Sequence, residues 1–306
     1  MHALHVSVLQ KVALLFSALG TEYCYLLILP LVYWLFDRKT GARLGILLLA
    51  SVLLNDLAKV AFHLPRPFQV DPTLMIIPAA MERSFGFPSG HAQGAFLVWP
   101  FLALQTRDKF KWLPIAYALA CCILLSRLIL GVHWPLDVVG GALIGSTMLF
   151  IYQHYGDFME RGFRGQTLIN QAIATIIFVA LCWGLGTFLI FKSVQAIGPT
   201  NAALVRAPLD LVGRCAALLG LVIGLVFAPR DVLAGGTTVQ KVGRTVVGLV
   251  GVVIFYVGIK VVSEDIIANF IRYFLTTFWV TCASLWVFRA LRLGGSDIQP
   301  RILAAD

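Results

Sequence analysis

Residues 41–63 read GARLGILLLASVLLNDLAKVAFH, an apolar run with few charged side chains. At about 1.5 Å per residue, a helix of this length crosses the roughly 30 Å hydrocarbon core of a bilayer. Since the period-2 alternation of membrane strands is absent, the sequence predicts an all-α, polytopic integral membrane bundle with about nine transmembrane helices. The other eight runs lie at 12–36, 89–106, 112–130, 135–155, 168–191, 203–228, 242–262 and 266–289.

The composition excludes several classes of protein. Of the 306 residues, 59% are hydrophobic and 13% are charged, against about 25% charged in soluble domains. A disordered chain and an ordinary cytosolic enzyme are therefore excluded. The formal charge is +9, but Lys and Arg form short clusters between apolar runs, so we expect a membrane topology signal and no nucleic-acid partner. The six cysteines lie inside apolar runs without CxxC spacing, which indicates buried small side chains.

The basic clusters also predict an orientation. They occupy alternate loops, and the loops that hold them are expected to be cytoplasmic. With nine spans, the N-terminus then lies outside, the C-terminus is cytoplasmic, and the loop 64–88 and the segment 131–134 face the exterior. The first apolar run is expected to be a retained membrane span and not a cleaved signal peptide, because it lacks a cationic region and a cleavage site. Without an N-x-[ST] sequon or a retention signal, a bacterial plasma membrane is favoured. The basic residues are Arg38, Lys39, Arg43, Arg107, Lys109, Lys111, Arg161, Arg164, Arg230, Lys241, Arg244, Arg289, Arg292 and Arg301.

Three segments with unusual polar residues converge on the predicted outer side. They read KVAFHLPRP at 59–67, FPSGH at 87–91 and SRLILGVHWPLD at 126–137. Ionisable residues near span ends are costly and mark a functional site. Lys59, Arg66 and Arg127 put three cations there, so the expected ligand is a multiply charged anion such as phosphate.

The remaining residues of these segments suit phosphate chemistry. Ser89 can cap the third span and Gly90 allows close approach, so the exposed amides of that helix end can seat a phosphate. His133 and Asp137 are four residues apart and share a helix face, so the carboxylate can hold one ring nitrogen and leave the other free to attack phosphorus. His91 can act as the acid. No cluster of carboxylates suggests a metal, and no cofactor is expected.

The order K-x6-RP, PSGH, SR-x5-H-x3-D resembles the type 2 phosphatidic acid phosphatase superfamily, which includes lipid phosphate phosphatases and glucose-6-phosphatase. The resemblance covers roughly residues 12–155. It implies metal-independent hydrolysis of a phosphomonoester or pyrophosphate through a phosphohistidine. By match to the motifs, His133 would be the nucleophile, Asp137 its partner and His91 the acid. The phosphate-binding residues would be Lys59, Arg66, Ser89, Gly90 and Arg127.

The expected organisation is a phosphatase core at 1–165 and additional helices of unassigned role at 166–306. A phosphorylated lipid is the expected substrate, because a site at the span ends lies at headgroup depth. A sugar-phosphate phosphatase and a lipid phosphotransferase remain open alternatives. A non-enzymatic anion transporter or lipid scramblase would use Arg206, Asp210 and Arg214, which share one helix face, although a structural ion-pair ladder is the more conservative interpretation. Asn55 is expected to make hydrogen bonds between helices.

Overall fold

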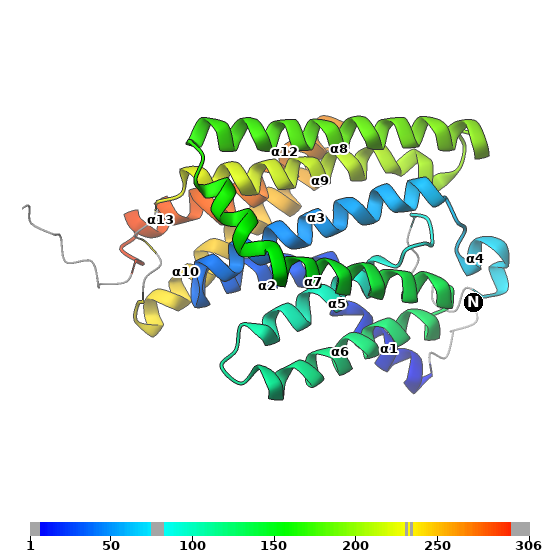
Figure 1. Ribbon diagram of the computed structural model, residues 1–306, viewed down its shortest axis with the longest axis horizontal. Helices are drawn as coiled ribbons and strands as arrows, with labels where there is room; N and C mark the ends of the chain where they lie inside the picture. The colour runs from blue at the N-terminus through cyan, green and yellow to red at the C-terminus, as the bar shows by residue number, and fades with distance from the viewer. Residues whose placement is uncertain (1–6, 75–82, 230–231, 233–234, 295–306) are drawn as a thin grey trace, which may run out of the picture. The chain divides into compact units, whose positions relative to one another are not determined.

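The computed structural model describes residues 7–74, 83–229, 232 and 235–294 (Figure 1). Within these ranges the chain forms helices and no strand, which confirms the all-α prediction. Arg230 and Arg301, two of the basic residues used for the orientation, lie outside the described residues. In chain order the helices are α1 (Val8–Ala18), α2 (Glu22–Leu31), the π-helical turn η1 (Val32–Phe36), α3 (Arg38–Phe62), α4 (Pro67–Val70), η2 (Pro72–Leu74), α5 (Gly90–Leu104), α6 (Lys109–Ile129), α7 (Pro135–Arg164), α8 (Leu168–Ile197), α9 (Ala202–Phe227), α10 (Thr238–Val253), η4 (Ile254–Gly258), α11 (Ile259–Val262), α12 (Ile266–Phe278), η5 (Trp279–Ala283) and α13 (Ser284–Ala290).

The number of membrane-crossing helices differs slightly from the prediction. In the part of the chain that the structure describes, seven helices are long and apolar enough to span a membrane, and eight if a bent pair counts as one span. That pair, Val8–Ala18 and Glu22–Phe36, covers the span expected at 12–36 and is bent by 45°. The run at 89–106 forms α5, which has 15 residues and is therefore only about 22 Å long.

The chain divides into two compact units. The first consists of Met1–Leu26, Leu47–Gln166 and Ala180–Leu211, and the second of Leu27–Ile46, Thr167–Val179 and Val212–Asp306. Each unit therefore draws on segments that are distant in sequence. The functional division at residue 165 stays a prediction.

Helix α5 forms the core of the first unit, where it packs against α6 and α7, while α1 packs against α6 (Figure 1). Glycines on α7 allow the close contact with α5. A Cβ atom at Gly141 would collide with the backbone carbonyl of Ser89, and one at Gly145 with that of Gln93. Five residues of α5 are completely buried: Ala92, Ala95, Leu97, Val98 and Phe101.

Tryptophan and tyrosine side chains hold the second unit together. Trp34 Nε1 donates to the Val280 carbonyl at 2.9 Å, and Trp279 Nε1 donates to the Gly248 carbonyl at 2.9 Å. The acceptor carbonyl of Val280 lies in the π-helical turn η5. Glycines of α10 make room for the rings, because a Cβ atom at Gly248 would collide with Trp34.

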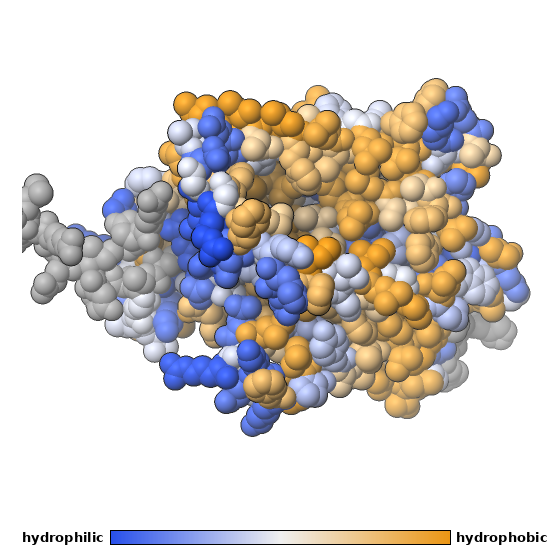
Figure 2. All heavy atoms as spheres, in the orientation of Figure 1, coloured by the Kyte–Doolittle hydropathy of each residue, from blue (hydrophilic) through white to orange (hydrophobic). Residues whose placement is uncertain are grey.

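The sides of the helices are apolar, as expected for contact with lipid. Figure 2 shows broad hydrophobic areas over the helices, whereas hydrophilic residues gather near helix ends. Helix α8 is the clearest case: Leu181, Trp183, Phe188 and Phe191 are each more than half exposed. Exposed apolar side chains at this density suit a bilayer and not water.

Candidate active site

The end of α3 supplies Lys59 and leads to Arg66. The helix ends at Phe62, and His63 has a positive φ of 38°, which turns the chain away from the helix axis. Arg66 then precedes α4, where Pro67 occupies the first turn, a position at which proline costs no hydrogen bond. Lys59 and Arg66 are both buried, with 6% and 0% of their surface exposed.

Backbone and hydroxyl oxygens of residues 84 and 85 hold these two cations. Lys59 Nζ donates to the Phe85 carbonyl at 2.6 Å. Arg66 Nε donates to the Ser84 carbonyl at 2.7 Å, and its Nη2 donates to Ser84 Oγ at 3.0 Å. These three hydrogen bonds use oxygens without a formal charge, and both cations also interact electrostatically with the Asp137 carboxylate.

The N-terminus of α5 follows Ser84 and Phe85 in sequence and is anchored to α7. Ser89 is the N-cap and accepts a hydrogen bond from the Ala92 amide, while its own amide donates to the Asp137 carbonyl at 2.9 Å. Ser89 is completely buried, whereas Gly90 is exposed. An exposed glycine at a helix N-terminus leaves backbone amides and the positive end of the helix dipole open to an anion.

His133 and Asp137 meet at the start of α7, as the four-residue spacing predicted. His133 Nδ1 lies 3.2 Å from Asp137 Oδ2, and the same oxygen accepts a hydrogen bond from the Trp134 amide at 2.9 Å. Both side chains are buried, with 3% and 2% exposed. Asp137 therefore does two things: it caps α7 and it fixes the imidazole ring.

The second ring nitrogen of His133 faces Arg66. Arg66 Nη1 lies 3.1 Å from His133 Nε2 and also donates to the Val132 carbonyl at 3.0 Å. Because a guanidinium can only donate, Nε2 must accept, and the ring proton is then on Nδ1, where it faces the Asp137 carboxylate. This tautomer leaves the lone pair of Nε2 directed toward the cationic group.

Arg127 extends the cationic group from α6. Its side chain is 2% exposed, and Nη1 donates to Ser17 Oγ of α1. His91 lies beside the same junction, because a Cβ atom at Gly20 would come within 2.9 Å of His91 Cδ2. The predicted site residues thus all lie in the first unit, with Arg127 and His91 next to the α1–α2 break.

A buried polar network behind α5 was only partly predictable. Asn55 Nδ2 donates to Gln93 Oε1 at 2.8 Å and to the Pro88 carbonyl at 3.3 Å, which confirms the expected hydrogen bonds between helices. Gln93 Nε2 in turn donates to Ser51 Oγ and to the Ser51 carbonyl, both at 2.7 Å. Gln93 is one turn from Ser89, so this network fixes the start of α5.

No metal cluster stands out among the described residues: none of their His, Cys, Asp and Glu side chains form a group of three that could hold an ion.

The structure does contain part of the predicted ion-pair ladder. Arg206 Nε lies 3.4 Å from Asp210 Oδ1, and Arg206 is 53% exposed. In the second unit, Arg214 Nη1 donates to Tyr273 Oη at 3.2 Å. These contacts agree with a structural role for the three residues.

Comparisons with known proteins agree with the motifs. The PAP2 superfamily model matches residues 40–159, and the model for the PAP2 superfamily phosphatase transmembrane extension matches residues 212–296. No solved structure matches the chain significantly.

The similar proteins are lipid phosphatases by name. Sphingosine-1-phosphate phosphatase 2 of Homo sapiens is 30% identical over 44% of this chain and 35% of its own length, so the chain spans about a third of that relative. The undecaprenyl-diphosphatases of Sulfolobus acidocaldarius and Bacillus subtilis are each 31% identical, over 48% and 51% of this chain and 70% and 79% of their own lengths. With the two family models and these relatives, the chain belongs to the PAP2 superfamily.

Proposed function

We propose that this membrane protein is a phosphatase that hydrolyses a phosphomonoester or pyrophosphate of a lipid through a phosphohistidine at His133. The observation that carries the proposal is the orientation of the His133 ring, with Nδ1 at 3.2 Å from Asp137 and Nε2 at 3.1 Å from a buried arginine. The names of the relatives, sphingosine-1-phosphate phosphatase and undecaprenyl-diphosphatase, support a lipid substrate.

The substrate phosphate would bind between the cations and the N-terminus of α5. Lys59, Arg66 and Arg127 neutralise its charge, while the Ser89 hydroxyl and the backbone amide of Gly90 hold the oxygens. Such preorganised donors stabilise the charge that develops on the oxygens in the transition state. Because three cations are present, this chain's own residues supply the neutralisation.

In the first step, the Nε2 lone pair of His133 attacks phosphorus. The new N–P bond forms as the bond from phosphorus to the leaving oxygen breaks, and His91 gives its proton to that oxygen. The positive charge that develops on the imidazole is stabilised by the Asp137 carboxylate. In the second step, neutral His91 accepts a proton from water, which attacks phosphorus and releases phosphate from His133.

The test is phosphate release by the purified protein in detergent, in buffer without divalent metal. Substrates would be phosphatidic acid, phosphatidylglycerol phosphate, a polyprenyl pyrophosphate, a sphingoid phosphate and glucose 6-phosphate. We expect release from a lipid, loss of release in His133→Ala, and full release in His154→Ala. His154 is a matched control because it lies on α7, the helix that His133 directly precedes, and is exposed.

A second readout tests the intermediate. Rapid acid-free quenching after exposure to a ³²P-labelled lipid should leave label on the wild-type protein that is stable to base and labile to acid. Label in the His133→Ala variant would refute the role of His133. Transfer of the label to an added alcohol, with no free phosphate, would indicate a phosphotransferase, and release from glucose 6-phosphate alone would indicate a sugar-phosphate phosphatase.

Activity that survives in His133→Ala but disappears in Asp210→Ala would instead favour the transporter or scramblase.

We also propose that the site faces the exterior or periplasm, with the N-terminus outside and the C-terminus cytoplasmic. The support is charge: Arg107, Lys109 and Lys111 are exposed at the ends of α5 and α6 opposite the site. In a cysteine-free background of intact cells, Lys109→Cys should resist a membrane-impermeant maleimide until the membrane is permeabilised. Immediate labelling would reverse the orientation. The expectation of a bacterial plasma membrane stays a prediction.

A further inference from the structure

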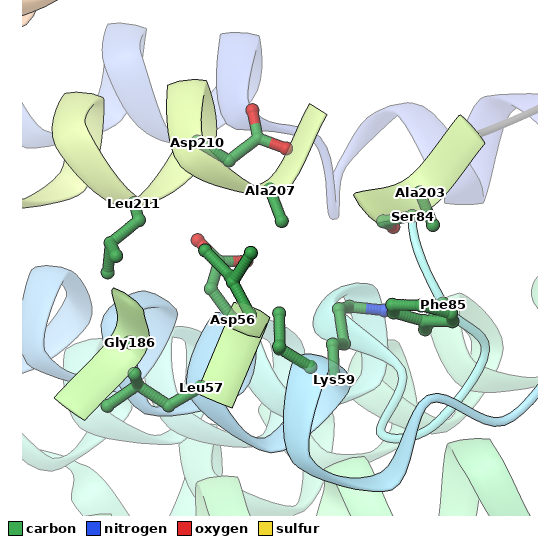
Figure 3. Close-up of a pocket in the computed structure, with 12 residues that line it drawn as sticks. Asp56, Leu57, Lys59, Ser84, Phe85, Gly186, Ala203, Ala207, Asp210 and Leu211 are labelled. Atoms are coloured by element: carbon green, nitrogen blue, oxygen red, sulfur yellow. The ribbon is translucent and has the colours of Figure 1, made fainter. Parts of the chain in front are cut away.

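A narrow cavity of about 30 Å³ opens beside the candidate active site, within the first unit. Figure 3 shows it between α3, the segment before α5, α8 and α9, with the Lys59 amine reaching toward Phe85 at one end. Its apolar lining consists of Leu57, Val60, Phe85, Gly186, Ile190, Ala203, Ala207 and Leu211.

The cavity shares residues with the candidate phosphate site. Lys59, Ser84 and Phe85 all line it. The carbonyl oxygens of the same Ser84 and Phe85 accept hydrogen bonds from the two cations, at 2.7 Å from Arg66 Nε and 2.6 Å from Lys59 Nζ. A ligand whose phosphate binds these cations therefore has the cavity as its adjoining space.

Packing around the cavity is firm, so it is a built feature of the fold. The buried side chains of Val60, Phe85, Ala203 and Leu204 form one cluster that joins α3, the segment before α5 and α9. Ser193 Oγ of α8 donates to the Val60 carbonyl at 2.7 Å, which fixes α8 against α3. The cavity therefore exists because small side chains line it within packed helices.

Two small positions set the width of the cavity. A Cβ atom at Gly186 would lie within 2.9 Å of Leu211 Cδ1, so the glycine lets α8 approach α9. Ala207 points from α9 into the space above Asp56 (Figure 3). A longer side chain at either position would fill the cavity.

The polar groups of the lining are mostly acceptors. The carboxylates of Asp56 and Asp210 and the hydroxyl of Ser84 line the cavity with the apolar residues. In a sphingoid phosphate, the segment that joins the phosphate to the hydrocarbon chain is itself mixed, because amino and hydroxyl donors sit on its first carbons. An apolar wall with a few acceptors suits that segment better than a chainless sugar or a bare hydrocarbon.

We propose that this cavity is the subsite for the segment of the lipid substrate that directly follows the phosphate. The α8 and α9 residues of its wall fall between the two family matches, at 40–159 and 212–296. They would therefore set the substrate preference of this chain, while the motif residues carry out the reaction. This inference rests on the phosphatase activity proposed above.

The test compares two substrates in each variant: a sphingoid 1-phosphate in mixed micelles and 4-nitrophenyl phosphate, which has no chain. We expect Ala207→Leu and Gly186→Leu to lower kcat/KM for the lipid at least tenfold and to change that for 4-nitrophenyl phosphate less than twofold. The matched controls are Ala202→Leu on α9, which is exposed, and Gly184→Leu on α8, where nothing lies within 4 Å of the added atom.

The outcomes separate the inference from the proposed function. If the wild type hydrolyses both substrates and the cavity variants lower both rates equally, or lower neither, the subsite is refuted while the phosphatase stands. If the wild type hydrolyses neither substrate, the proposed function fails and the subsite with it. A melting temperature like that of the controls would show that the variants are folded.

Discussion

Replacing Gly141 by alanine should separate the two helices that carry the proposed reaction. An alanine Cβ would collide with the Ser89 carbonyl and lie 3.2 Å from the Gln93 amide nitrogen. To restore ordinary van der Waals contact, α5 and α7 must move apart by roughly 1 Å. The same shift would stretch the 2.9 Å hydrogen bond from the Ser89 amide to the Asp137 carbonyl.

The size of the effect follows from this displacement. His133 and Asp137 move with α7, whereas Ser89 and Gly90 move with α5, so the proposed nucleophile and the proposed phosphate-binding residues lose their alignment. A misplacement of about 1 Å costs on the order of 100-fold in rate. Overpacking of a tight contact also destabilises a protein by about 1–3 kcal/mol. We therefore expect kcat for the lipid to fall about 100-fold, with a lower melting temperature.

The assay is phosphate release in detergent together with thermal unfolding, and α7 offers two controls. Gly162→Ala adds a Cβ with nothing within 4 Å, so it should keep full activity and gain up to about 1 kcal/mol from helix propensity. Gly145→Ala meets the Gln93 carbonyl one turn farther from the site, so it should lower stability more than it lowers kcat. A kcat for Gly141→Ala within threefold of that for Gly162→Ala would refute the reasoning.

Three further predictions concern other parts of the first unit. Asn55→Leu removes the donor to Gln93 and Pro88. The two buried acceptors then lack a partner, which should lower the free energy of unfolding by about 1–3 kcal/mol. A melting temperature equal to that of the exposed control Asn170→Ala would contradict this. His63→Gly relieves a φ of 38° and should stabilise the protein by about 1 kcal/mol, so a lower melting temperature would count against strain at this residue. Hydrogen bonds from the Thr73 hydroxyl and the Thr73 amide hold the pKa of Asp71 below its ordinary value, so their stabilisation is present above that value and is lost as the pH falls through the lowered pKa. Thr73→Val should therefore raise the pKa of Asp71 in an NMR titration in micelles, and an unchanged pKa would show that the hydroxyl contributes nothing.

Much of the architecture could be predicted because membrane helices leave a strong signal in sequence. Long apolar runs predicted the helices, and the i, i+4 spacing of His133 and Asp137 predicted their contact at the start of α7. The motif order could also place Lys59, Arg66 and Arg127 at one end of the bundle, since each follows or precedes an apolar run.

Other features depended on contacts between segments that no local pattern encodes. The break between α1 and α2 lies within an apolar run, where Gly20 is the sole hint of a bend. Ser17 and Ser84 reach the cations through tertiary packing, and a lone serine carries no signal of that. Arg66 was assigned only to phosphate, yet in the structure it also contacts the second nitrogen of His133, 67 residues away in the chain.

The contact between Arg66 and His133 Nε2 implies that a ligand must bind before Nε2 can react. One N–H of Arg66 cannot at the same time point to His133 Nε2 and to a phosphate oxygen, since the two acceptors compete for a single hydrogen. A multiply charged anion that draws the guanidinium toward itself would uncover the lone pair by the act of binding. Until then Nε2, the proposed nucleophile, contacts a group that cannot react with it. A movement of the Arg66 side chain would thus accompany substrate binding and expose His133 Nε2 at the same time. An uncharged electrophile would not draw Arg66 away, so the imidazole would stay hydrogen-bonded and less reactive.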